Sequence, residues 1–190
     1  MGQSRRSADP EAVTENPSSH VLTSGRMEDT RRGDSIFWAA ILLLFLFTRW
    51  PAFSQYLSID NVNLAFSLEH YEPLNHQPQP PGYPLFVLTA RIINVAFHDA
   101  ETTFRFISLA ASVLCLPLAF AIGRRMFGGW AGRAAVLLLL VNPVFWFASI
   151  EGPLRPFLAL FSLLTAYCSW RCWKGERVYL FYGAVALGIG

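Results

Sequence analysis

Residues 57–94 read LSIDNVNLAFSLEHYEPLNHQPQPPGYPLFVLTARIIN, and this stretch decides the fold class and the topology. From Asp60 to Glu69 it has helical potential, because its apolar residues can share one broad face. Pro73 ends such a helix. The run HQPQPPGYP at residues 76–84 must be extended or turned, since proline removes a backbone donor and restricts the residue before it. The stretch therefore predicts a short helix followed by a rigid turn.

An apolar run at residues 85–97 follows this turn and is interrupted by Arg91 and Asn94. Such a run is too short to cross a hydrocarbon core about 30 Å thick, which requires about 20 residues. We therefore expect an interfacial helix that lies along the membrane and does not cross it.

The composition of the whole chain is typical of a polytopic membrane protein. Of its 190 residues, 53% are hydrophobic and 15% are charged, against roughly 25% charged in an ordinary soluble domain. The charges are concentrated in the first stretch and in short gaps between long apolar runs. The sequence thus predicts an all-α bundle of transmembrane helices, in which an outer loop contains amphipathic juxtamembrane helices. The predicted spans are about 35–53, 102–123, 130–150, 157–173 and 178–190, with a disordered cytosolic tail at 1–34 and an outer loop at 54–101.

The distribution of arginines sets the orientation of these spans. If residues 85–97 do not cross, Arg124, Arg125 and Arg133 lie on the same side as Arg31 and Arg32, as the positive-inside tendency requires. This predicts a multi-pass protein of the cell membrane with a cytosolic N-terminus. The outer loop and the turn at residues 151–155 then share the non-cytosolic face.

Two further expectations concern the ends of the predicted spans. Arg49, near the end of the first span, is expected to extend toward the far interface. The last apolar run reaches Gly190 without a polar residue to close it, and from this we expect a fragment of a longer protein or a truncated product.

Asp60 is the leading candidate for catalysis. It lies only a few residues beyond the first span, and a carboxylate placed there can act as a general base. The alternative is that Asp60 caps the N-terminus of the helix that follows it. His76 is a candidate ligand, hydrogen-bond donor or proton shuttle, and its alternative role is to bond the backbone of the proline turn.

Other charged groups on the predicted outer face are candidates for binding an anionic substrate. Arg155 is suited to a phosphate group, and Glu151 and Arg155 face the cavity of Asp60 or form a local ion pair or cap. Arg91 and Arg105 have the same potential, or simply meet lipid phosphate. We find no metal signature, because His70 and His76 stand on either side of Pro73 and share no helix face; any need for a divalent metal stays open.

Several motifs, taken in order, resemble a known family. They are an Asp shortly after the first span, H-x-P-x-P-P-G-Y-P-L at residues 76–85, R-x-I-S-L-A-A-S-V-L at 105–114 and G-R-R-M-F-G-G-W-A-G-R at 123–133. From residue 36 onward the chain resembles the N-terminal part of the GT-C superfamily of membrane glycosyltransferases. The nearest branch is the protein O-mannosyltransferase-like group, which includes the lipid A aminoarabinose transferases.

The resemblance implies transfer of a sugar from a polyprenyl-phosphate donor to a protein, lipid or glycan acceptor on the non-cytosolic side. It implies Asp60 as the catalytic base. The candidate substrate-binding residues are His76, Gln79, Arg91, Arg105, Glu151 and Arg155. The chain departs from relatives at three positions. Asn61 follows Asp60 where many relatives have a second acid, Gln79 stands where some have Lys, and Arg155 stands near a position where some have Asp.

Two alternatives to a glycosyltransferase are a transporter subunit and a non-catalytic membrane scaffold. A transporter subunit places ionisable groups within its spans, near the midplane, whereas the predicted spans hold almost none. A non-catalytic membrane scaffold is the remaining alternative. No nucleic-acid partner is expected, and the predicted partners are the lipid-linked donor, the acceptor and membrane lipids.

Overall fold

The structure, a computed structural model, describes residues 34–52 and 59–190. These residues are mostly helical and form no strand, which confirms the predicted all-α class. The predicted N-terminal tail and the first residues of the predicted outer loop lie outside the described residues.

The described helices follow one another with short connections. The first runs over Asp34–Ala52, and its last turn, Trp50–Ala52, is a 3₁₀ helix. The others are α2 (Ile59–Glu69), η2 (Pro73–Asn75), α3 (Pro84–Phe97), α4 (Ala100–Phe127), α5 (Gly129–Val141), α6 (Pro143–Glu151), α7 (Leu154–Trp173) and α8 (Val178–Ile189).

The chain divides into two compact units, Met1–Ala40 and Ile41–Gly190. In the first unit, the structure describes only the beginning of the first helix, where the rings of Phe37 and Trp38 pack edge to face at 5.6 Å. The second unit holds the rest of that helix and every other described helix.

Length and apolar composition allow the first helix and α4 to cross a membrane, and α3 and α8 are shorter apolar helices. The sequence predicted one span over residues 130–150, where the structure has two helices, α5 and α6, bent by 59°. Pro143 supplies no backbone N–H to the helical ladder, and the side chain of Asn142 accepts a hydrogen bond from the N–H of Phe145 and so begins a new helix.

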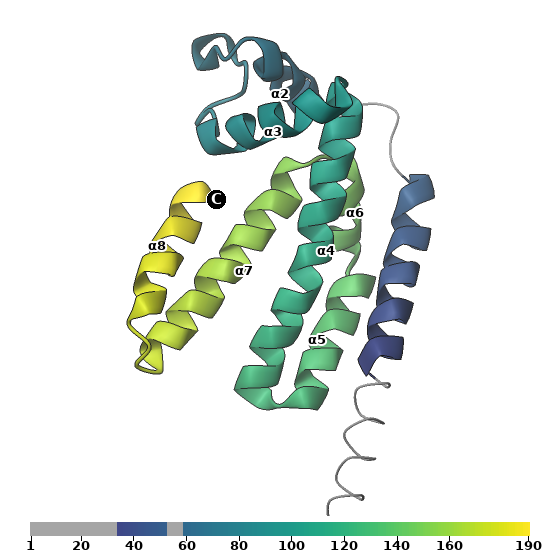
Figure 1. Cartoon of the computed structure of the whole chain (residues 1–190). Helices are drawn as coiled ribbons and strands as arrows, with labels where there is room; N and C mark the ends of the chain where they lie inside the picture. Colours follow the sequence, from purple (N-terminus) through teal and green to yellow (C-terminus); the bar gives the residue numbers. More distant parts are fainter. Residues whose placement is uncertain (1–33, 53–58) are drawn as a thin grey trace, which may run out of the picture. The chain divides into compact units, whose positions relative to one another are not determined.

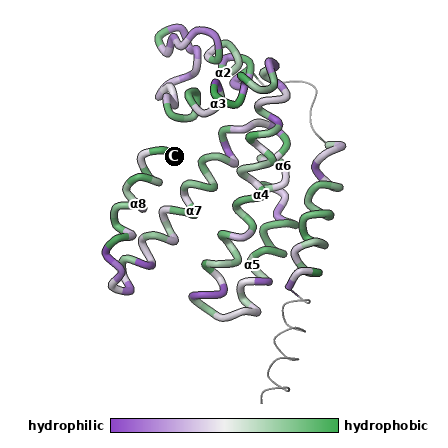
Figure 2. The backbone as a smooth tube through the Cα atoms, viewed as in Figure 1, coloured by the Kyte–Doolittle hydropathy of each residue, from purple (hydrophilic) through white to green (hydrophobic). Residues whose placement is uncertain are grey.

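Within the second unit, α4 packs along both α5 and α7, and α7 packs along α8. Figure 1 shows α2 and α3 across the end of these helices at which α4 begins and α6 passes into α7. The α4–α5 and α7–α8 connections lie at the other end, where Figure 2 shows hydrophilic residues against the hydrophobic helices. Figure 2 shows hydrophilic residues in the region of α2 and α3 as well, so the most hydrophobic part of the long helices lies between two ends that both carry polar residues.

A cluster of buried apolar side chains joins α2 and α3 to the longer helices. It consists of Leu64, Phe86, Val87, Ala90, Phe104, Ile107 and Phe157. The rings of Phe86 and Phe157 meet edge to face, with centroids 5.1 Å apart, an arrangement that favours aromatic pairs beyond the area they bury. This packing fixes α2 and α3 against α4 and α7.

Candidate active site

Asp60 lies in the first turn of α2, which begins at Ile59. It therefore sits inside the helix and not at the N-cap position that the sequence offered as the alternative. A carboxylate in the first turn is stabilised by the helix dipole and by the free N–H groups of that turn. The side chain is exposed and can meet a substrate.

The proline-rich loop brings Gln79 to Asp60. Nε2 of Gln79 donates a hydrogen bond of 2.7 Å to Oδ1 of Asp60. The loop is closed at its base by two backbone hydrogen bonds between Glu72 and Gln77, of 2.6 and 3.1 Å. The amide of Gln79, a predicted substrate-binding residue, is thus engaged with the candidate base, and that it binds substrate stays a prediction.

Gly82 completes the turn that follows Gln79. Its N–H donates to the carbonyl of Gln79 over 2.9 Å, and its φ of +93° lies in the region that favours glycine. A Cβ at this position would stand 2.7 Å from the hydroxyl oxygen of Tyr71. The turn is thus both left-handed and tightly packed, which holds the loop close to α2.

The turn between α6 and α7 forms the opposite wall. The guanidinium of Arg155, in the first turn of α7, is paired with the carboxylate of Glu151, the last residue of α6. Nδ2 of Asn61 donates a hydrogen bond of 2.7 Å to the backbone carbonyl of Glu151. A Cβ added to Gly152 would lie 2.5 Å from the amide of Asn61, so the turn and α2 are in close contact.

These elements enclose a small cleft of about 70 Å³. Its lining among the described residues is Asp60, Asn61, Glu151, Gly152, Leu154 and Arg155. Asp60, Glu151 and Arg155, which the sequence placed on one face of the membrane, therefore meet in one cavity. The cleft combines a carboxylate that can accept a proton with a guanidinium that can hold an anion.

The other three candidate residues lie elsewhere. His76 is exposed at the end of η2, and its backbone N–H donates to the carbonyl of Pro73 over 3.2 Å. Arg91 donates to the carbonyl of Ser67 through Nε and Nη2, over 3.2 and 2.8 Å, at the C-terminal end of α2. Arg105 pairs with Glu101 at 2.7 Å. That these residues bind substrate stays a prediction.

Three residues of the cleft, Asn61, Gly152 and Leu154, were not expected to contribute to it. The sequence marked Asn61 only as a departure from relatives that carry a second acid there. Its burial and its bond to Glu151 depend on a residue ninety positions away, which no local pattern predicts. Among the described residues, no group of three His, Cys, Asp or Glu side chains is placed to hold a metal ion.

Comparison with known proteins identifies the family of this chain. A family model described as dolichyl-phosphate-mannose-protein mannosyltransferase matches residues 77–190, which is more than half of the chain. The matched segment includes Gln79, Glu151 and Arg155, and Asp60 precedes it. No curated protein and no solved structure gives a significant match.

Proposed function

Because the chain belongs to the dolichyl-phosphate-mannose-protein mannosyltransferase family, whose members are membrane glycosyltransferases of the GT-C type, we propose that it uses a polyprenyl-phosphate-linked sugar as donor. The acceptor is a protein, lipid or glycan on the non-cytosolic face of the membrane. The observation that carries the proposal is the cleft that Asp60 and Arg155 both line.

In this mechanism Asp60 is the general base. The acceptor hydroxyl or amine attacks the anomeric carbon of the donor sugar, and its proton passes to the carboxylate of Asp60. The new bond to the anomeric carbon forms as the bond from that carbon to the phosphate oxygen breaks. Positioned general bases of this kind contribute about 10²–10⁴-fold to a rate.

The leaving group is a polyprenyl phosphate, which departs with the bonding electron pair. Arg155 is the group that stabilises the charge on this phosphate, because its planar guanidinium offers several N–H donors in one plane. Glu151 orients that guanidinium through their ion pair. Gln79 keeps the carboxylate of Asp60 turned toward the cleft through their hydrogen bond.

The cleft lies at the end of the second unit formed by α2, α3 and the α6–α7 turn. We assign this end to the non-cytosolic side, because Arg124 and Arg125, in the last turn of α4, and Arg133, near the start of α5, belong to the other end and follow the positive-inside tendency. The donor then reaches the cleft from the membrane interface, where a lipid phosphate resides.

The test is Asp60→Asn in the full-length protein, purified and assayed for transfer from polyprenyl-phosphate mannose, with other polyprenyl-phosphate sugars in parallel. We expect at least a 100-fold loss, on the order of what a general base contributes. Glu69→Gln is the matched control, because Glu69 is an exposed carboxylate on the same helix and outside the cleft lining. Transfer near the wild-type rate in Asp60→Asn contradicts the assignment of the base.

A further inference from the structure

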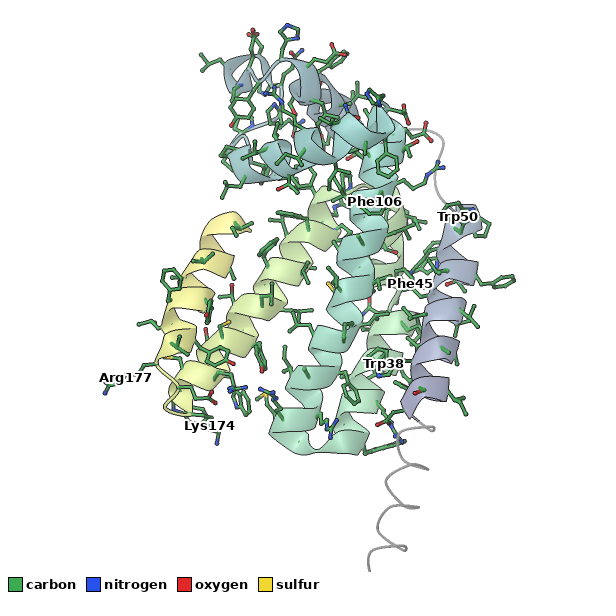
Figure 3. All side chains as sticks on the ribbon, viewed as in Figure 1. Trp38, Phe45, Trp50, Phe106, Lys174 and Arg177 are labelled. Carbon is green, nitrogen blue, oxygen red and sulfur yellow. The ribbon has the colours of Figure 1, made fainter. Side chains whose placement is uncertain are left out.

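Arg49 is a buried charged residue outside the lining of the cleft. Its exposed fraction is 1%, whereas the sequence suggested a side chain that extends to the interface. A buried guanidinium is costly unless its donors are satisfied. Nη1 of Arg49 donates to the hydroxyl of Thr48 over 2.9 Å, and its guanidinium carbon lies 4.2 Å from the ring centroid of Phe45. Figure 3 labels Phe45 on the first helix, and this ring is fully buried.

The remaining contacts of Arg49 lie on the two sides of the α5–α6 break. Nη2 donates over 3.0 Å to the carbonyl of Leu140, near the end of α5. Nε donates over 3.2 Å to Oγ of Ser149, in α6. The last carbonyls of a helix have no intrahelical donor, so the guanidinium supplies one at the point where the helix is interrupted. One rigid, planar group thus joins both halves of the bent pair.

A series of hydrogen bonds leads from this contact to the cleft. The hydroxyl of Ser108, on α4, donates over 2.7 Å to the carbonyl of Ser149. The same hydroxyl lies 3.4 Å from the carbonyl of Gly152. Glu151, next to Gly152, accepts through its carbonyl from Asn61 of α2. The end of α6 is therefore held on one side by Arg49 and Ser108 and on the other by Asn61.

We propose that Arg49 is a positioning residue for the cleft. By holding Leu140 and Ser149 together, Arg49 sets the angle between α5 and α6. This angle in turn sets the positions of Glu151 and Arg155 relative to Asp60. Arg49 touches no residue of the cleft lining in the contacts described above, so it acts through α6. The inference rests on the proposed function of the cleft, because its consequence for activity is a change in the transfer step.

The first readout is structural and needs no activity. The bend is measured as the distance between two spin labels, attached to cysteines introduced at Leu138 in α5 and Phe147 in α6, which are both exposed. The native cysteines, Cys115, Cys168 and Cys172, are replaced by alanine in all variants. We expect Arg49→Met to shift or broaden this distance distribution. Arg177→Met is the matched control, because Arg177 lies at the distant end of α7 (Figure 3) and should leave the distribution unchanged.

The second readout is kcat per folded molecule. A displacement of about 1 Å at a catalytic group can cost on the order of 100-fold, so we expect a loss of about 10- to 100-fold in Arg49→Met. Arg49→Lys should recover little of it, because a single ammonium does not reproduce two donors held in one plane. Ser149→Ala removes the contact of Arg49 with α6, together with the hydrogen bond from the Ser149 hydroxyl to the carbonyl of Trp146. Its effect on kcat should not add to that of Arg49→Met, since residues in contact are coupled.

The outcomes separate this inference from the proposed function. An unchanged spin-label distance in Arg49→Met, or a changed distance with wild-type kcat, overturns the positioning role. A lower melting temperature with an unchanged kcat of the folded protein also overturns it, since that is the result for a purely structural residue. If Arg49→Met does not fold, Ser149→Ala carries the same two measurements. Wild-type transfer by Asp60→Asn refutes the proposed function instead, and the distance measurement still decides whether Arg49 sets the bend.

Discussion

Gln79 and Asp60 are joined by a hydrogen bond of 2.7 Å between a side-chain amide and a carboxylate oxygen. The two residues come from different elements, since Gln79 belongs to the proline-rich loop and Asp60 to the first turn of α2. One oxygen of the candidate base is therefore engaged by the protein, and the carboxylate is held in a defined orientation.

Removal of this hydrogen bond should reduce the transfer rate without unfolding the protein. We expect Gln79→Ala to lose about 10-fold in kcat, since a hydrogen bond to a charged group is worth about 1.5–3 kcal/mol. Asn75→Ala is the matched control, because its amide bonds a carboxylate of the same loop, that of Glu72. Equal losses in both variants would mean that the loop as a whole matters, and not the contact with Asp60.

The close approach of Gly152 to Asn61 predicts that a substitution at Gly152 lowers stability and that a second substitution at Asn61 restores part of it. Gly152→Ala places a methyl group 2.5 Å from the amide of Asn61, and crowding of this kind costs about 1–3 kcal/mol. The φ of Gly152 is −179°, which any residue can adopt, so the cost is steric. Thermal unfolding in detergent should show a lower midpoint for Gly152→Ala. The double variant Asn61→Ala/Gly152→Ala should recover part of it, and a double variant no better than Gly152→Ala argues against the contact.

Asp99 gives a prediction about pH. Its side chain accepts a hydrogen bond of 2.7 Å from the N–H of Thr102 and caps α4. This interaction with Thr102 lowers the pKa of Asp99 below its usual value. A lowered folded-state pKa means that the stabilisation is present above the ordinary carboxyl pKa and is lost as the pH falls through the folded-state value.

Asp99→Ala should therefore cost about 1 kcal/mol at neutral pH, the usual value of an N-cap. The difference from wild type should shrink as the solution is acidified. Asp99→Asn is the control, because an amide oxygen also caps a helix and does not titrate in this range. The measurement is the unfolding midpoint as a function of pH, and a difference between wild type and Asp99→Ala that grows on acidification would contradict the assignment.

The proposed orientation can be tested by cysteine labelling in intact cells. A cysteine at His98, after α3, should react with a membrane-impermeant maleimide added outside, if residues 85–97 do not cross. A cysteine at Gly129, the first residue of α5, should react only after permeabilisation; a Cβ there meets no atom within 4 Å. Labelling of both positions from the same side would refute the proposed topology.

Much of the fold follows from local signals in the sequence. The proline run predicted where α2 ends and the turn begins, and the length of the apolar run predicted that α3 would be a short helix. The sequence also predicted that Asp60 and Arg155 lie on the same face of the membrane, because the distribution of arginines predicted how many times the chain crosses the membrane between them. That they line one cleft required the packing of α2 against the α6–α7 turn.

Two features could not be predicted in the same way. The break between α5 and α6 has a local signal, the Asn142-Pro143 dipeptide, but apolar residues continue on both sides and conceal it. Arg49 has no local signal for burial, because its partners Leu140 and Ser149 are distant in the chain and are brought to it only by tertiary packing. The local sequence around a charged residue at the end of an apolar run is the same whether its side chain contacts water or a buried carbonyl.

The cluster formed by Leu64, Phe86 and Phe157 has a consequence for how such proteins can diversify. Leu64 lies one turn after Asp60 on α2, and Phe157 lies two residues after Arg155 on α7. The spacing between the two walls of the cleft is therefore set by side chains that do not face it. Arg155, which lines the cleft, and Gln79, which contacts Asp60 from outside the lining, can be exchanged to accommodate another sugar while the scaffold that sets the spacing is retained.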